Sequence, residues 1–330
     1  MDSTYIASFG HTRALAPDFI DLTSKANKLS REGILEILKK PPYSKNLERY
    51  SILYKPPELV EMVVNSTFVD RMLIALSFSP PTVKPFMREY ISKFDIENVI
   101  LLISAKLLKK KIELVEPRLI TVNGMPASFD IGLIPRSEYA ELLKKDSLES
   151  VYEELYKHER LSILHGLPSV ERGDIYTVRK TLEENYYSRL LSYFKFYNGN
   201  EGQIRLFIRS LIDIRNLMNV IKCVDSGIKF DEYLIEGGIL SRREIIERFS
   251  NSDVDKVIEN SGFELKDELN LYKEDRLISR FEIKMREELL GRYYQIFRTN
   301  PMSVGDLLWY ILKSEDEKMT IIEGWYDAED

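Results

Sequence analysis

The histidines and carboxylates of this chain do not form the spacing of an active or metal site. The three histidines, His11, His158 and His165, are scattered, whereas a zinc site needs three or four clustered ligands. Adjacent glutamates such as Glu183 and Glu184 point about 100° apart on a helix, which predicts solvated charge rather than a general acid–base pair. No Gly-rich phosphate loop, His-Glu-x-x-His motif or nucleophile elbow occurs. We therefore expect no catalytic residue, metal or cofactor.

An Asp-Ile-x-Asn tetrapeptide occurs twice, once with Asp95 and Asn98 and once with Asp213 and Asn216. Polar residues at positions i and i+3 lie on the same helix face, and both pairs lie within apolar stretches. A buried amide must be hydrogen-bonded. The predicted role is therefore structural: each pair ties a long helix to the backbone of a neighbouring turn. The residues that contact partners are not identified by any motif.

Helical periodicity dominates the segments that position these residues, and glycine is sparse, with 15 in 330 residues. Apolar residues recur at steps of three and four, which is typical of one buried helix face. The expected long helices cover 57–78, 84–108, 171–197, 200–224, 264–298 and 303–323. Ser303 is the expected cap of the last helix, because serine is favoured at that position.

Two loop-like interruptions, at 112–136 and 225–240, divide the chain into thirds. The predicted helical lobes are 1–110, 111–225 and 226–330. A short internal repeat supports this division: 29–38 and 240–249 share five of ten residues, and each predicts a short helix capped by a serine. This order fits one unit used more than once, a short capped helix followed by long helices, although the middle third matches the short-helix block poorly.

The composition is that of a globular protein, with 44% hydrophobic and 30% charged residues. The net charge is −6, which argues against nucleic acid and against direct docking on anionic lipid. A single cysteine, Cys223, excludes an intrachain disulfide and fits a reducing compartment. The most apolar stretch, 96–108, is too short to cross a bilayer. The N-terminus is not a secretory signal, so we expect a soluble protein that is not exported.

Several segments in a fixed order resemble the C subunit of archaeal A-type ATP synthases, a family similar to the d subunit of vacuolar ATPases. The resemblance covers nearly the whole chain. It is carried by Tyr5, Arg13, Leu29-Ser30, Tyr43, Phe94 to Asn98, Ala105-Lys106, Leu182-Glu183, Tyr186-Tyr187, Ile212 to Asn216, Phe281-Glu282, Asn300 to Ser303, Leu307 to Tyr310, and Lys313.

The sequence departs from the family pattern at two places. Ser104 and Lys222 stand near positions where the family usually has an arginine, and the segment 315–322 lacks the expected Asn-Leu-Arg. The second departure concerns the third predicted lobe.

The resemblance implies an all-α fold of three similar lobes around a pseudo-threefold axis, shaped like a funnel. It also implies a non-catalytic rotor subunit of a proton-translocating A/V-type ATP synthase. One copy would connect the D and F subunits of the central stalk to the proteolipid ring, at the cytoplasmic face of the membrane. The alternative from another class is a helical-repeat scaffold, which would show shorter repeats of roughly 34–47 residues.

Overall fold

The computed structural model describes residues 3–15, 19, 30–110, 115, 118, 119, 141, 142, 144–168, 173–193, 201–299 and 304–328. Every regular element within these ranges is a helix, so the predicted all-α class is confirmed. The expected interruption at 112–136 lies almost entirely outside the described residues, as does Ser303.

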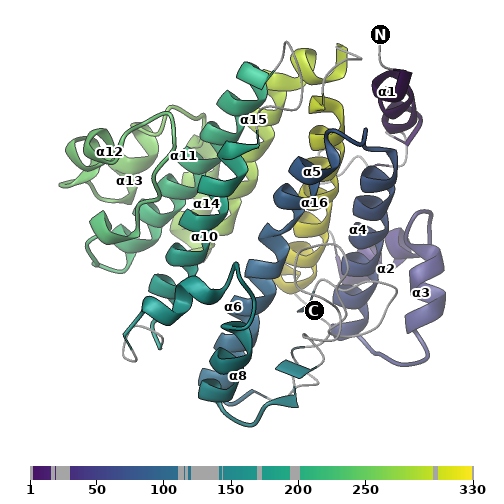
Figure 1. The fold of residues 1–330 in the computed structure, drawn as a ribbon, viewed down its shortest axis with the longest axis horizontal. Helices are drawn as coiled ribbons and strands as arrows, with labels where there is room; N and C mark the ends of the chain where they lie inside the picture. Colours follow the sequence, from purple (N-terminus) through teal and green to yellow (C-terminus); the bar gives the residue numbers. More distant parts are fainter. Residues whose placement is uncertain are drawn as a thin grey trace.

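The first part of the chain forms two long helices and several short ones (Figure 1). They are α1 (Ser3–Leu15), α2 (Arg31–Leu38), α3 (Ser44–Tyr50), α4 (Glu58–Phe78), α5 (Lys84–Ile91), α6 (Lys93–Leu107), α8 (Leu148–Leu155) and the 3₁₀ helix η5 (Ser162–Gly166).

The second part contains the longest helices. They are α10 (Ile175–Ser192), α11 (Glu201–Asp225), the 3₁₀ helix η6 (Asp231–Tyr233), α12 (Arg242–Phe249), α13 (Val254–Glu259), α14 (Lys266–Asp275), α15 (Ser279–Thr299) and α16 (Gly305–Asp327).

Local sequence explains where several of these helices begin. The Ser30 hydroxyl accepts a hydrogen bond from the Gly33 amide at 3.1 Å and caps α2. Ser241 caps α12 in the same way and forms a reciprocal capping box with Glu244. The two serine-capped helices predicted from the repeat are therefore confirmed. α4 begins directly after Pro57, as the sequence indicates.

Two predicted continuous helices are divided in the structure. The expected helix over 84–108 is interrupted at Ser92, between α5 and α6. The expected helix over 264–298 ends at Asp275 and restarts at Ser279, because Arg276 has a left-handed backbone with φ of 62°. A non-glycine residue seldom adopts this conformation, so nothing in the local sequence marks the break.

The C-terminal helix α16 runs through the middle of the molecule, with α4 on one side and α15 on the other (Figure 1). It also packs against α1 and α2. Because α16 contacts both N-terminal and C-terminal elements, the first and last segments of the sequence share one packing unit. Gly305 begins the helix where a Cβ atom would lie 2.3 Å from the Phe297 ring, so α15 and α16 meet too closely for any side chain there.

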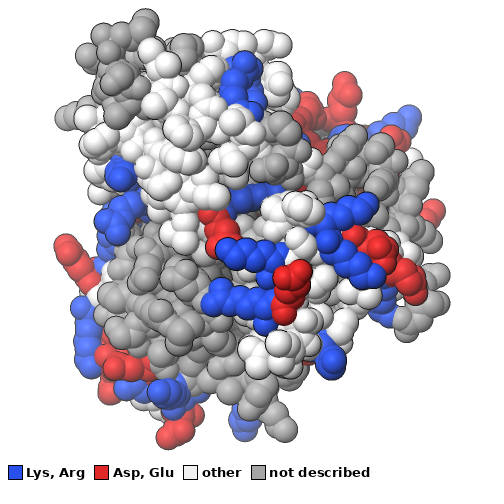
Figure 2. Space-filling view, turned by 90° about the vertical axis from the view of Figure 1, so that its right-hand side faces the viewer, with Lys and Arg blue, Asp and Glu red and all other residues white. Residues whose placement is uncertain are grey.

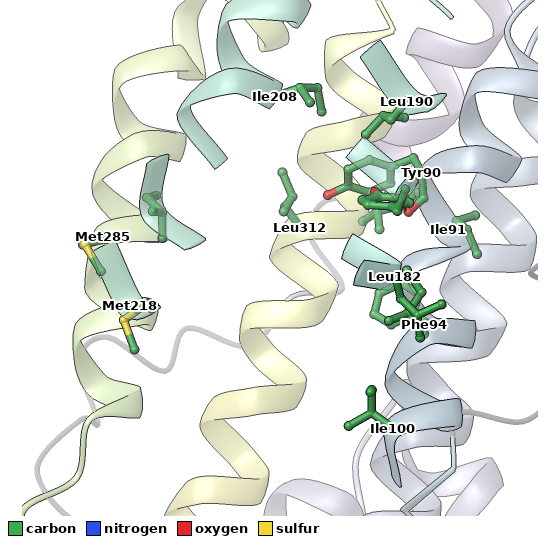
Figure 3. Packing of buried hydrophobic residues seen from close by; sticks show 14 of the residues in the cluster. Tyr90, Ile91, Phe94, Ile100, Leu182, Leu190, Ile208, Met218, Met285 and Leu312 are labelled. Atoms are coloured by element: carbon green, nitrogen blue, oxygen red, sulfur yellow. Dashed lines mark hydrogen bonds between the residues drawn. The ribbon is translucent and has the colours of Figure 1, made fainter. Parts of the chain in front are cut away.

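A continuous apolar core extends from residue 68 to residue 312 and draws on all three predicted lobes. Figure 3 shows Tyr90, Leu182 and Leu190 gathered beside Leu312 of α16, and Met218 of α11 near Met285 of α15. A smaller cluster joins α2 and the start of α4 to Ile321 and Trp325. The three-lobe funnel and its boundaries stay predictions.

None of the described helices is both long and apolar enough to cross a membrane. Acidic and basic side chains are interspersed over the face that Figure 2 shows. The described surface toward the top of that view is largely uncharged.

Candidate functional site: a charged cluster around the central helix

Three consecutive acidic residues, Glu315, Asp316 and Glu317, lie in the middle of α16, and each is 5% exposed. Acidic residues are seldom buried unless they are paired. Successive residues on a helix point about 100° apart. The three side chains therefore point in different directions: Glu315 and Asp316 both pair with Arg286 of α15, whereas Glu317 pairs with Arg71 of α4.

Glu315 connects α16 to α6 and α15. Its Oε2 atom lies 2.6 Å from Lys93 Nζ and 2.9 Å from Arg286 Nη2, and its Oε1 atom accepts from Arg286 Nη1 at 3.0 Å. Burial alone would raise the pKa of Glu315, but Arg286 and Lys93 outweigh it and hold that pKa far below its usual range. Burial likewise opposes the charge of Lys93, yet Glu315 raises the pKa of this ammonium. All three groups are therefore ionised.

Glu317 connects α16 to α4. It accepts a hydrogen bond from Arg71 Nη1 at 2.8 Å, and the Tyr43 hydroxyl donates to the same carboxylate oxygen. Burial, followed by the charge of Glu317, raises the pKa of Tyr43 well above its usual value. The Arg71 guanidinium also lies over the Phe19 ring, 4.6 Å from its centroid. This side of the cluster is therefore fixed by a charge pair, a hydroxyl and a ring.

A fourth buried acid, Asp306, fixes the start of α16. Arg298 Nη1 of α15 donates to it at 2.6 Å, and the Thr12 hydroxyl of α1 donates to its other oxygen. Burial raises the pKa of Asp306, although Thr12 and Arg298 act in the opposite direction. The central helix is thus held by charged or polar contacts to α1, α4, α6 and α15.

A cavity of about 100 Å³ lies beside this cluster, between α6, α10, α11, α15 and α16. Its charged lining is balanced and consists of Lys93, Arg179, Arg215, Arg286, Glu97, Glu183, Glu282 and Glu315. Across it, Arg215 of α11 binds Glu183 of α10 through two hydrogen bonds of 2.7 and 2.9 Å. Such two-point pairs fix geometry as well as charge. The arrangement joins helices to one another.

The predicted residues Asp213 and Asn216 lie on α11, facing the connection to α12. Asn216 donates to the Ile235 carbonyl at 2.8 Å and accepts from the Ile235 amide at 2.7 Å. Asp213 accepts from the amides of Ile239 and Leu240 at 3.0 and 3.2 Å. Burial raises the pKa of Asp213 to about 6, against the opposing effect of these two amides.

Two further residues extend this contact along the same face of α11. Arg209 donates to the Gly238 carbonyl at 2.6 Å, and Asn219 donates to the Tyr233 carbonyl at 2.8 Å. A Cβ atom at Gly238 would lie 2.1 Å from Asp213 Oδ1, so the turn requires glycine at this point. The side chains at 209, 213, 216 and 219 together hold the connection against the helix.

The other predicted pair, Asp95 and Asn98, lies on α6 and is 4% and 2% exposed. Asp95 borders a small cavity that is also lined by His158, Arg160 and Arg189. Asp95 and Asp213 thus have different neighbours, and the two Asp-Ile-x-Asn pairs do not form one common site. Their equivalence within repeated lobes stays a prediction.

Comparison with known proteins identifies the family. The sequence pattern of the family described as ATP synthase (C/AC39) subunit matches residues 23–322. The chain belongs to this family. It is 27% identical to the C subunit of the A-type ATP synthase of Thermoplasma volcanium over 331 residues, covering 97% of this chain and 93% of that protein.

Two other relatives bear the same name. The C subunit of the A-type ATP synthase of Thermoplasma acidophilum is 28% identical, over 96% of this chain and 92% of its own length. That of Pyrococcus horikoshii is 26% identical, over 78% of this chain and 68% of its own length. The resemblance seen in the sequence is thereby confirmed, and the chain is an ATP synthase subunit of this family.

Sequence reasoning missed the charged cluster of this family member. The segment 315–322 stood out only as a departure from the family pattern, and nothing identified Lys93, Arg71 or Arg286 as its partners. One signal was present. Glu315 to Glu317 occur between the apolar runs 307–312 and 321–322, so three successive charges interrupt an otherwise buried helix and must be paired.

Proposed function

We propose that this chain is a non-catalytic rotor subunit of a proton-translocating A-type ATP synthase. In this proposal it joins the D and F subunits of the central stalk to the proteolipid ring, and it works at the cytoplasmic face of the membrane. The family to which the chain belongs and the shared name of its relatives support its assignment to an A-type ATP synthase complex. One copy serves each motor.

The main support for the proposal is that buried charged and polar contacts hold α16 to its neighbouring helices. A part that transmits torque must resist relative sliding of its helices, which requires directional contacts in addition to apolar packing. Three buried acids of α16, Asp306, Glu315 and Glu317, make contacts to α1, α4, α6 and α15. The Glu183–Arg215 pair adds a similar link between α10 and α11. The charged side chains of the cluster pair with one another and so hold the helices together. This pairing supports a mechanical role over a chemical one.

Co-purification tests the partners. A tagged full-length chain is expected to retain the proteolipid ring from detergent-solubilised membranes and, separately, to retain the purified D–F complex. A folded chain that retains neither partner contradicts the proposal. Retention of the ring alone would restrict the role to a ring-associated scaffold, which is the alternative from the helical-repeat class.

Cross-linking tests the rotor assignment. A disulfide or chemical cross-link between this chain and the ring is expected to leave ATP hydrolysis and its coupling to ion transport intact, because both parts would turn together. A cross-link between this chain and a stator component is expected to stop ATP hydrolysis. If the ring cross-link stops hydrolysis as well, the chain is stationary and the rotor assignment is wrong.

A further inference from the structure

The turn between α3 and α4 exposes two adjacent aliphatic side chains. Ile52 is 86% exposed and Leu53 is 73% exposed, more than any other large hydrophobic residue that the structure describes. Single exposed aliphatic residues are ordinary on a protein surface. Two neighbours that both project almost fully into solvent, at the tip of a turn, require a different explanation.

The turn that presents them is well ordered by its own contacts. The Leu53 amide donates to the Tyr50 carbonyl at 2.9 Å, and the Tyr54 amide donates to the same carbonyl at 3.0 Å. The Tyr50 side chain is 2% exposed and belongs to the small core of α2, α4 and α16, and the Tyr54 ring packs edge-on against it at 6.3 Å. The turn that presents Ile52 and Leu53 to solvent is therefore anchored by the buried Tyr50 side chain.

The sequence segment that carries the tip has a basic excess, in contrast to the whole chain, although Glu36 and Glu58 lie just outside it. Residues 39–55 contain five basic side chains and one acidic, a net charge of 5 − 1 = +4, whereas the chain carries −6. The basic residues are Lys39, Lys40, Lys45, Arg49 and Lys55, and all five are exposed. Lys39 pairs with Glu36, which reduces the local excess by one. Figure 2 views the molecule from the side on which α3 lies, and Lys and Arg side chains lie across the middle of this face with Asp and Glu side chains between them.

We propose that the tip at Ile52 and Leu53, together with the basic residues of 39–55, is an interfacial anchor that contacts an anionic lipid surface. Aliphatic side chains that protrude from a basic surface match the layered chemistry of a bilayer, with anionic headgroups above hydrocarbon. A protein interface instead needs a broad complementary patch of about 800 Å² per partner, and two protruding side chains do not supply it.

Long-range repulsion does not oppose this contact, although the net charge of the chain argued against lipid. Exposed charges farther away than about 10 Å are largely screened at physiological salt. The local excess of positive charge therefore decides the interaction. The inference rests on the proposed function only in that a subunit of this motor works beside a membrane. Vesicle binding tests it without the other subunits.

The experiment is co-sedimentation of the full chain with vesicles of phosphatidylcholine alone or with 30% phosphatidylglycerol. We expect binding to the anionic vesicles at physiological salt, with about fivefold weakening for each basic residue removed, and little binding to neutral ones. I52S/L53S is expected to weaken binding by about tenfold or more. The matched control I228S/L271S, which alters two exposed aliphatic residues elsewhere, is expected to leave it unchanged. Circular dichroism confirms that each variant is folded.

Any of four outcomes would overturn the inference. The wild-type chain fails to bind anionic vesicles, or binds neutral ones equally well. The tip and control variants lose binding to the same extent. Alternatively, I52S/L53S keeps vesicle binding but no longer retains the proteolipid ring, which would make the tip a protein contact. Loss of vesicle binding with intact retention of the ring and of the D–F complex supports the anchor while leaving the rotor proposal in place.

Discussion

Arg71 of α4 and Glu317 of α16 pair at 2.8 Å although 246 residues separate them in the sequence. The two side chains are 5% and 4% exposed, so neither charge is solvated by bulk water. A charge at such a site is stable only with its partner. The pair therefore fixes how the C-terminal helix lies against the N-terminal part of the chain.

Removing one member of this pair is expected to be strongly destabilising. Arg71→Met leaves the Glu317 carboxylate buried without its cation, which costs about 3–5 kcal/mol of unfolding free energy. In R71M/E317Q the remaining amide can still accept from the Tyr43 hydroxyl. The double variant should therefore be more stable than the sum of the single variants predicts. Denaturant unfolding followed by circular dichroism measures each term.

The exposed pair Arg243–Glu247 on α12 is the matched control, because its atoms are 2.7 Å apart but its side chains are 86% and 60% exposed. Arg243→Met is expected to cost at most about 1 kcal/mol. Equal losses at the two sites would mean that burial does not govern the Arg71–Glu317 contact.

Signals that depend on only a few neighbouring residues, such as capping serines and apolar periodicity, predicted the helices well. Ser30 and Ser241 mark the starts of α2 and α12, and apolar periodicity identifies α4 and α11. The break at Arg276 was not predictable, because its left-handed backbone is unusual for a residue other than glycine. The partners of Glu315 and Glu317 were also hidden, since pairing between distant segments leaves no local pattern.

The asparagine of each Asp-Ile-x-Asn pair is expected to contribute separately to stability. Asn216→Leu leaves both the amide and the carbonyl of Ile235 without their side-chain partner, at a cost of about 1–3 kcal/mol. Asn98→Leu on α6 is expected to cost a similar amount. The two losses should add within about 0.5 kcal/mol, because the residues lie on different helices, α6 and α11.

Asn219→Leu is the control for this experiment, because Asn219 makes a single hydrogen bond to the Tyr233 carbonyl and is only half-buried. We expect a loss of about 1 kcal/mol. If the Asn98 and Asn216 variants keep wild-type stability but lose retention of the ring or of the D–F complex, those residues are interface contacts and the structural interpretation is wrong.

Glycine positions should respond in opposite directions according to the space around them. Gly238→Ala places a Cβ atom where Asp213 Oδ1 lies, at 2.1 Å, and is expected to cost about 2 kcal/mol or more. Gly291 lies inside α15, and a Cβ atom added there would meet no heavy atom within 4 Å apart from the backbone of its own helix. Gly291→Ala is therefore expected to stabilise the protein by about 0.5–1 kcal/mol. In an Asp213→Ala background, Gly238→Ala should cost much less, because the clashing carboxylate is gone. Melting temperatures that fall equally for both glycine variants would contradict this assignment.

Asp316 gives a pH dependence whose sign follows from its environment. Burial raises its pKa from near 3.8 to about 6, although the charge of Arg286, with Nε 3.2 Å away, lowers it. Neither carboxylate oxygen receives a hydrogen bond from any described residue. Glu315 and Glu287 add to the rise in this pKa, and Lys313 opposes it. The folded chain therefore binds this proton more tightly than the unfolded chain does.

Because the raised pKa favours the protonated folded state, the contribution of Asp316 to stability is greatest below pH 4 and falls as the pH rises to about 6. A rise of about two units corresponds to about 3 kcal/mol. Asp316→Asn cannot ionise, so the stability of D316N relative to wild type should improve by about that amount between pH 4 and pH 7.5. Urea unfolding at both pH values measures the difference. A constant difference across this range would show that Asp316 is fully ionised in the folded chain and that Arg286 outweighs its burial.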